Sequence, residues 1–199
     1  MLEFKVGDIM KITVGVSNRH VHLNKEDLNI LFGKNYVLTK LRDIKQTGQF
    51  VCEETVSIET EKAKIEKVRV MGPIRSYTQV EISRTDAYKL GINPPIRTSG
   101  DLDSSAPIKL IGPEGTLEKE NGCIQANRHI HITKELRKVF GFTNTDEVMI
   151  YVSGEKGGFM DHVYFKESDD AIFELHIDTD DANAFMLKTG DIVDIVKRS

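Results

Sequence analysis

The sequence predicts a mainly β protein that consists of two related halves with short helices. Three observations lead to this prediction. β-branched and aromatic residues gather in short runs that Gly, Pro, Asn and Asp separate, which is typical of strands joined by turns. Helix signals are few and short. A motif built around two histidines occurs twice, each time with similar flanking sequence.

The predicted strands are short runs that favour the pleated, half-buried surface of a sheet. In chain order they are residues 12–16, 55–58, 68–71, 79–82, 148–152, 163–165, 172–177 and 192–196. Capping residues predict four short helices, each starting after a polar side chain and ending near a glycine. These helices are 25–32 after Asn24, 134–140 after Thr133, one from Thr85 to near Gly91, and one from Asp180 to near Gly190. The polar stretch 97–107 is predicted to be a loop.

The composition is that of an ordinary globular chain. Of 199 residues, 39% are hydrophobic and 29% charged, which allows one large domain or two small ones. The sequence contains neither a long apolar run nor a secretory leader, so we expect no membrane partner. A net charge of −4 argues against general nucleic-acid binding. Cys52 and Cys123 do not form a CxxC pair, so we expect each to be a small buried hydrophobic side chain without a disulfide. This fits a reducing cytoplasm.

An internal repeat is the main signal in this sequence. The segment SNRHVHL at residues 17–23 returns as ANRHIHI at residues 126–132. A second segment, VEISRTDA at 80–87, aligns with LHIDTDDA at 175–182. Both pairs occur in the same order along the chain. We therefore predict two related β-rich halves that each carry one copy of a site.

The repeated histidines predict two metal sites. Residues i and i+2 of a strand face the same side, so each HxH pair can hold one ion. A catalytic zinc usually has three protein ligands, and the second repeat supplies the third, because Glu81 and His176 occupy equivalent positions between apolar neighbours. Zinc is expected at both, although Co²⁺, Ni²⁺ or Fe²⁺ would be chemically acceptable. The predicted sets are His20, His22 and Glu81, and His129, His131 and His176.

Three arginines stand close to the predicted ligands in the sequence. Arg19 and Arg128 each precede an HxH pair and, by strand alternation, point away from the histidines. Structural salt bridges are therefore at least as well supported for them as substrate contacts. Arg75 precedes Glu81 after a turn and could hold a tetrahedral oxyanion with its fork of N–H groups. His162 has no counterpart in the repeat, which favours a structural or surface role.

Six segments together resemble the PduL-type phosphate acyltransferases, also called phosphate propanoyltransferases. They are VSNRHVHL at 16–23, GPIR at 72–75, QVEISRTD at 79–86, SG at 99–100, NRHIH at 127–131 and HIDTDDAN at 176–183. The resemblance spans about residues 12–196. It implies two β-barrels with short capping helices, and two zinc ions at their junction. The N-terminal strand would join the C-terminal barrel, giving barrels of about residues 19–126 and about residues 1–18 with 127–199.

The resemblance also implies roles for individual residues. The metal ligands of the family fall on the six residues already named, and its phosphate-binding arginine falls on Arg75. The expected partners are coenzyme A or acyl-CoA, and phosphate or acyl phosphate. Contacts with coenzyme A would fall on Val16, Ser17, Asn18, Asn183, Ser99 and Ala106.

The implied reaction interconverts acyl-CoA and phosphate with acyl phosphate and CoA, for a short acyl chain such as acetyl or propanoyl. Phosphate held by the metals and Arg75 would attack the thioester directly, and a covalent route through Cys123 would require an activation for which the sequence shows no signal. The acyl-chain length, a homo-oligomeric state and the direction of flux stay open at this point.

Two other functions compete with acyl transfer. A dizinc hydrolase would use a zinc-bound hydroxide, but Asn24 replaces the aspartate of the HxHxDH pattern of zinc β-lactamases. A cupin-like metal-binding or sugar-binding module is the second alternative. His20, His22, Glu26 and Gly33 fit one cupin half-motif, but the second half-motif is missing and the residues after His22 look helical.

Members of this family inside bacterial microcompartments often carry an amphipathic N-terminal extension. Here residues 1–11 precede the first predicted strand, which is short for such a helix, although Leu2, Val6 and Ile9 share a helical face. We therefore expect a cytoplasmic enzyme, with the microcompartment lumen as the alternative.

Overall fold

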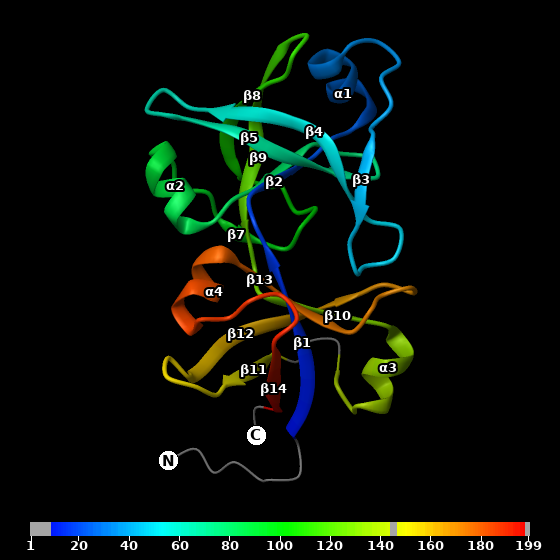
Figure 1. Ribbon diagram of the computed structural model, residues 1–199, viewed down its shortest axis with the longest axis vertical. Helices are drawn as coiled ribbons and strands as arrows, with labels where there is room; N and C mark the ends of the chain where they lie inside the picture. The colour runs from blue at the N-terminus through cyan, green and yellow to red at the C-terminus, as the bar shows by residue number, and fades with distance from the viewer. Residues whose placement is uncertain (1–8, 144–146, 198–199) are drawn as a thin grey trace. The chain divides into compact units, whose positions relative to one another are not determined.

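The computed structural model describes residues 9–143 and 147–197 (Figure 1). In chain order the elements are β1 (Ile9–Ser17), β2 (His20–His22), α1 (Lys25–Phe32), β3 (Lys40–Asp43), β4 (Phe50–Glu59), β5 (Lys64–Gly72), β6 (Gln79–Glu81), α2 (Arg84–Leu90), β7 (Ile96–Arg97), β8 (Ala106–Ile111), β9 (Thr116–Ala126), β10 (His129–Ile132), α3 (Lys134–Val139), β11 (Val148–Val152), β12 (Gly158–Glu167), β13 (Glu174–Asp178), α4 (Thr179–Phe185) and β14 (Ile192–Lys197). No helix within the described ranges has the length and apolarity needed to span a membrane.

The chain divides into two compact units. One consists of Asn18–Ala126 and is called the N-unit below; the other combines Met1–Ser17 with Asn127–Ser199 and is called the C-unit. The chain therefore passes from the C-unit to the N-unit after Ser17, and back after Ala126. Both passages fall directly before an HxH motif.

The C-unit is a closed barrel with the strand order β1-β13-β10-β12-β11-β14. β1, blue in Figure 1, pairs in parallel with β13 and antiparallel with β14, so this N-terminal strand closes a ring of C-terminal strands. The inward-facing side chains are β-branched and aliphatic, as strands with one buried face require. The fully buried core includes Ile130, Ile150, Leu175 and Ile195.

The N-unit has the strand order β3-β4-β5-β2-β6-β9-β7, and β8 pairs with both β4 and β9. These two pairings close β4, β5, β2, β6, β9 and β8 into a second six-stranded ring. Its fully buried core includes Val21, Val70, Val80 and Leu110. The fold is therefore mainly β with two barrels, as the sequence predicts, and the described part of the chain contains four short helices.

The two rings match strand by strand. β2 runs parallel to β5 and antiparallel to β6, and β10 runs parallel to β12 and antiparallel to β13. β9 pairs in parallel with β6, as β1 does with β13. The register also agrees, because Ile124 lies opposite Glu81 and Gly15 lies opposite His176. The duplication seen in two short motifs thus covers the whole barrel.

The helices confirm two predicted starts and correct two others. Asn24 and Thr133 cap α1 and α3 as predicted. The caps of α2 and α4 are Ser83 and Asp178 instead of Thr85 and Asp180. Both caps have an extended backbone, and the side-chain oxygen of each accepts a hydrogen bond from a backbone N–H in the first turn of its helix. α4 also ends earlier than predicted, at a left-handed Met186 instead of near Gly190.

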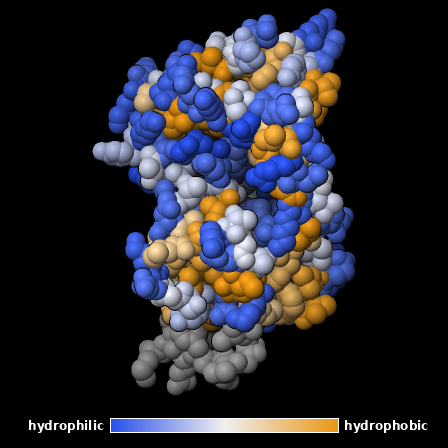
Figure 2. Space-filling view, in the orientation of Figure 1, coloured by the Kyte–Doolittle hydropathy of each residue, from blue (hydrophilic) through white to orange (hydrophobic). Residues whose placement is uncertain are grey.

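The predicted loop 97–107 is shorter than expected, because β7 includes Arg97 and β8 begins at Ala106. The long strand β9 was not predicted from the sequence. Its first half contains several charged residues with alternately exposed side chains, so it lacks the apolar run by which the other strands were predicted. On the face drawn in Figure 2, polar and apolar residues are interspersed. Two exposed aromatic residues of the C-unit, Tyr151 and Phe159, pack against each other with ring centroids 5.2 Å apart.

Candidate metal and anion sites

Strands β2 and β6 bring the first predicted triad together in the N-unit. Glu81 lies directly opposite His20 on the antiparallel neighbour. Its carboxylate oxygens lie 3.5 Å from Nε2 of His20 and 3.9 Å from Nε2 of His22. One donor atom from each residue lies within 4.8 Å of the others. The three side chains are thus close enough to share one ion.

Strands β10 and β13 build the equivalent triad in the C-unit. His176 lies directly opposite His129. The ring centroid of His131 lies 4.9 Å from that of His129 and 4.5 Å from that of His176. Donor atoms of these three histidines again lie within 4.8 Å of one another. Both predicted sets of side chains are therefore assembled by the fold.

Backbone carbonyls orient the first histidine of each triad. Nδ1 of His20 lies 2.8 Å from the carbonyl oxygen of Asn18, and Nδ1 of His129 lies 2.9 Å from that of Asn127. When Nδ1–H donates to the carbonyl, Nε2 is the nitrogen that can coordinate an ion. Such hydrogen bonds are the usual outer-shell support of metal-binding histidines. The residues present therefore fit a metal at both triads.

The charge of Glu81 acts on His20. Burial lowers the pKa of His20, but the negative charge of Glu81 and hydrogen bonds to Glu81 and Asn18 outweigh burial and raise the pKa overall. The positive charge of Arg75 opposes this rise, since Arg75 is an electrostatic neighbour of His20. The triad and the predicted phosphate-binding arginine thus lie in one electrostatic environment.

Arg75 is fixed at both its backbone and its guanidinium group. Its backbone N–H donates to the carbonyl of Leu23 at 2.9 Å, which ties it to the chain just after β2. Nη1 donates to the hydroxyl of Tyr77 at 3.0 Å and to Oγ of Ser99 at 3.1 Å. Among the described residues, the contacts of this guanidinium group use Nη1, so Nη2 and Nε can take part in binding an anion.

A hydrogen-bonded path connects Arg75 to the triad. Ser99, which accepts from Arg75, also accepts from Nε2 of Gln79 at 2.9 Å. The same Nε2 lies 2.5 Å from Oε1 of Glu81, and the backbone N–H of Gly100 donates to Oε1 of Gln79 at 2.7 Å. Sequence analysis missed the roles of Tyr77 and Gln79. No local sequence pattern marks these two residues, because their contacts depend on the position of the loop after β7, which contains Ser99 and Gly100.

Arg19 and Arg128 form structural ion pairs. Nε and Nη2 of Arg128 lie 2.9 and 2.6 Å from the two carboxylate oxygens of Asp181. Arg19 grips Asp86 in the same way, at 2.8 and 2.7 Å. Hydrogen bonding to Asp181 raises the pKa of Arg128 although burial opposes the rise. Each pair ties the start of an HxH strand to the helix that follows the third ligand.

We expect Arg128→Ala to lower the free energy of unfolding by about 1.5–3 kcal/mol, because it leaves a partly buried carboxylate without its charged donor. Urea denaturation followed by circular dichroism measures this. The control is Lys11→Ala, also in the C-unit, whose ion pair with Asp194 is 74% exposed on the lysine side and should contribute less than about 1 kcal/mol. Equal effects of the two variants would contradict the structural role of Arg128.

The residues predicted to contact coenzyme A lie in both units. Val16 and Ser17 end β1, where the backbone N–H of Val16 donates to Oγ1 of Thr189 at 3.1 Å. Asn183 is exposed on α4. In the N-unit, Asn18 is exposed, Ser99 belongs to the Arg75 network, and Ala106 is buried opposite Cys123. Their contacts with coenzyme A stay predictions.

Both cysteines are buried, and neither forms a disulfide. Burial raises the pKa of Cys123 to about 12, and it raises that of Cys52 to about 12 as well. Because the thiolate is the nucleophilic form of cysteine, neither side chain is activated for attack near neutral pH.

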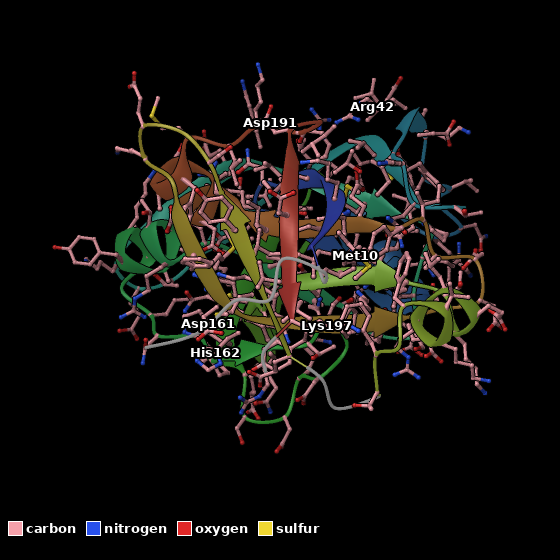
Figure 3. All side chains as sticks on the ribbon, turned by 90° about the horizontal axis from the view of Figure 1, so that it is seen from below. Met10, Arg42, Asp161, His162, Asp191 and Lys197 are labelled. Atoms are coloured by element: carbon pink, nitrogen blue, oxygen red, sulfur yellow. The ribbon has the colours of Figure 1, made fainter. Side chains whose placement is uncertain are left out.

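The structure also bears on the other sequence signals. Glu26, which the cupin half-motif requires, is exposed on α1, and Asn24 caps that helix by accepting from the N–H of Asp27. His162, labelled in Figure 3, is exposed and lies 3.1 Å from a carboxylate oxygen of Glu147. The N-terminal pattern of Leu2 and Val6 lies outside the described residues, and Ile9 begins β1.

Fold and sites define a duplicated β-barrel protein with two candidate metal centres and an arginine beside one of them. A family model described as phosphate propanoyltransferase matches residues 13–188. The phosphate propanoyltransferase of Thermotoga maritima is 51% identical over 187 residues, which are 94% of this chain and 89% of the relative. Those of Rhodopseudomonas palustris and Rhodobacter capsulatus are 44% and 46% identical, over 96% and 94% of this chain and 84% and 86% of the relatives. The chain belongs to the phosphate propanoyltransferase family.

Proposed function

We propose that this chain is a phosphate acyltransferase that interconverts acyl-CoA and phosphate with acyl phosphate and CoA. The acyl group is short, propanoyl or acetyl, and the relatives are named for the transfer of propanoyl. The observation that carries the proposal is the path of hydrogen bonds from Arg75 through Ser99 and Gln79 to Glu81. It joins an anion-binding group to a metal triad within one unit.

Zinc is the proposed ion for both triads, because imidazole-rich sets with three ligands suit Zn²⁺. When bound, such ions supply positive charge for phosphate and Lewis acidity for a carbonyl. The two triads differ in composition, since one contains the carboxylate of Glu81 and the other consists of three histidines.

Arg75 is the proposed phosphate-binding residue and acts through its positive charge and its donors. The hydroxyl of Ser99 already accepts two hydrogen bonds, so its own O–H can donate to an oxygen of the bound anion. Held in this way, a phosphate oxygen attacks the carbonyl carbon of the thioester. The C–O bond forms, the C–S bond breaks, and the sulfur leaves with the electron pair and takes up the proton that phosphate releases. Arg75 stabilises the negative charge on the carbonyl oxygen during this step.

Coenzyme A is proposed to contact Val16, Ser17, Asn18 and Asn183, together with Ala106. The exposure of Asn18 and Asn183 supports this role. Because Oγ of Ser99 lies 3.1 Å from Nη1 of Arg75, we propose that Ser99 contacts both the phosphate and the thioester end of coenzyme A.

The test is a panel of acyl-CoA thioesters incubated with purified protein, with and without inorganic phosphate. We expect CoA release that requires phosphate and produces stoichiometric acyl phosphate. Release of CoA at the same rate without phosphate would identify a hydrolase. Binding of metal without turnover of any thioester would favour a binding module.

Direct transfer predicts that Cys123→Ala retains most of the activity, because a buried thiol with a pKa of about 12 cannot serve as a nucleophile. The rate of acyl phosphate formation measures this, and the melting temperature separates lost activity from lost folding. An inactive but folded variant would indicate a covalent acyl-cysteine route.

A further inference from the structure

We propose that Glu174 is a positioning residue that accepts a hydrogen bond from Nε2–H of His176 and so directs Nδ1 of His176 to the metal. This inference rests on the proposed role of His129, His131 and His176 as ligands. It assigns an outer-shell partner to the C-unit triad and predicts which ring nitrogen coordinates.

The duplicated strands place Gln79 and Glu174 at equivalent positions. Each stands two residues before the third ligand of its triad, on β6 or on β13. Gln79 lies opposite His22, and Glu174 lies opposite His131. Both residues are buried: Gln79 is 0% exposed and Glu174 is 5% exposed. The same place in each barrel is therefore filled by a polar side chain beside the triad.

The chemistry at this place differs between the units in a complementary way. In the N-unit, the amide Nε2 of Gln79 donates to Oε1 of Glu81 at 2.5 Å. In the C-unit, Oε2 of Glu174 lies 2.9 Å from Nε2 of His176. A carboxylate ligand needs a donor, and an imidazole ligand needs an acceptor. Each unit carries at this position the group that its own third ligand requires.

Gly15 supplies a second, independent observation. It lies opposite His176 on β1, and a Cβ at this position would lie 2.9 Å from Cδ2 and 3.0 Å from Nε2 of His176, and 3.1 Å from Cδ of Glu174. The Cδ2–Nε2 edge of the ring therefore faces β1. The equivalent residue opposite Glu81 is Ile124, which carries a full side chain.

The orientation of the ring decides which nitrogen reaches the metal. β13 lies between β1 and β10, and β10 carries the other two histidines. Because the Cδ2–Nε2 edge faces β1, the opposite edge with Nδ1 faces β10. His129 has the reverse arrangement, since its Nδ1 is held by the carbonyl of Asn127. The C-unit triad would thus combine Nε2 of His129 with Nδ1 of His176.

The first test measures zinc affinity. Metal-free protein is titrated with Zn²⁺ against a chromophoric chelator, for the wild type, Glu174→Ala, Glu174→Gln and the exposed control Glu155→Ala. We expect Glu174→Ala to weaken one of two sites by about 10–100-fold. Glu174→Gln keeps an acceptor oxygen, so its loss should be smaller, and Glu155→Ala should match the wild type. Unchanged affinity in a folded Glu174→Ala variant would overturn the inference.

The second test observes the histidine nitrogens directly. Long-range ¹H–¹⁵N spectra of zinc-loaded protein labelled with ¹⁵N-histidine separate zinc-bound from protonated ring nitrogens, and His176→Ala assigns the signal. We expect zinc on Nδ1 and a proton on Nε2 of His176, and Glu174→Ala should disturb this pattern while Glu174→Gln restores most of it. Zinc on Nε2 of His176 would overturn this inference but leave the proposed ligand set intact. If wild-type and His131→Ala proteins bind equal amounts of zinc, the proposed ligand set itself is wrong.

Discussion

Arg75→Ala is expected to lower kcat for phosphate-dependent acyl transfer by about 100–1,000-fold, the typical effect of removing a charged or oriented donor from a developing oxyanion. The variant also loses the group that we propose binds phosphate, so KM for phosphate should rise. Arg75→Lys keeps the charge but not the fork of N–H groups, and its donor cannot reach both Tyr77 and Ser99 in the same geometry. We therefore expect it to recover only part of the lost rate.

The matched control for Arg75 is Arg42→Ala, an exposed arginine on β3 of the same unit that is labelled in Figure 3. It removes the same charge and should leave kcat and KM unchanged. Initial rates at varied phosphate, together with the melting temperature, separate the two variants. If folded Arg75→Ala turned over at the wild-type rate, the phosphate site proposed here would be wrong.

His131→Ala is expected to reduce bound zinc from two ions per chain to one and to reduce turnover by more than about 100-fold. The loss should exceed the roughly 10–100-fold effect of removing an outer-shell partner, because His131 is a proposed ligand itself. Its side chain is buried beside His176, with ring centroids 4.5 Å apart. Elemental analysis of protein purified without chelator gives the stoichiometry, and the acyl phosphate assay gives the rate.

His162→Ala serves as the control for His131→Ala. It removes an exposed imidazole of the same unit that contacts Glu147 and lies outside both triads. We expect two zinc ions and normal turnover. Wild-type zinc content in folded His131→Ala would exclude this residue as a ligand, whatever its activity.

The two candidate triads could be predicted from sequence because two local rules combine. Alternation along a strand places His20 and His22 on one face, and the repeat aligns Glu81 with His176. The proposed outer-shell role of Glu174 could not be found in this way. Glu174 lies two residues from His176, yet this proposed role depends on the register between β10 and β13 and on the space that Gly15 provides. Register and close packing are set by tertiary contacts, which a single sequence does not display.

The helix starts show the same limit on a smaller scale. Asn24 and Thr133 come shortly after the HxH strands β2 and β10, so their capping role could be read locally. Ser83 comes shortly after β6 and Asp178 is the last residue of β13, but a second capping residue follows each of them. Which of two candidates caps the helix depends on where the backbone leaves the extended conformation.

The two rings differ in how the chain closes them. The N-unit is one contiguous segment, Asn18–Ala126, and its own last strand β9 completes the ring. The C-unit instead needs β1 from the start of the chain, which pairs with β13 and β14 near its end. As the chain is synthesised from its N-terminus, the ring of the N-unit can therefore close first, whereas β1 waits for the last strands to emerge.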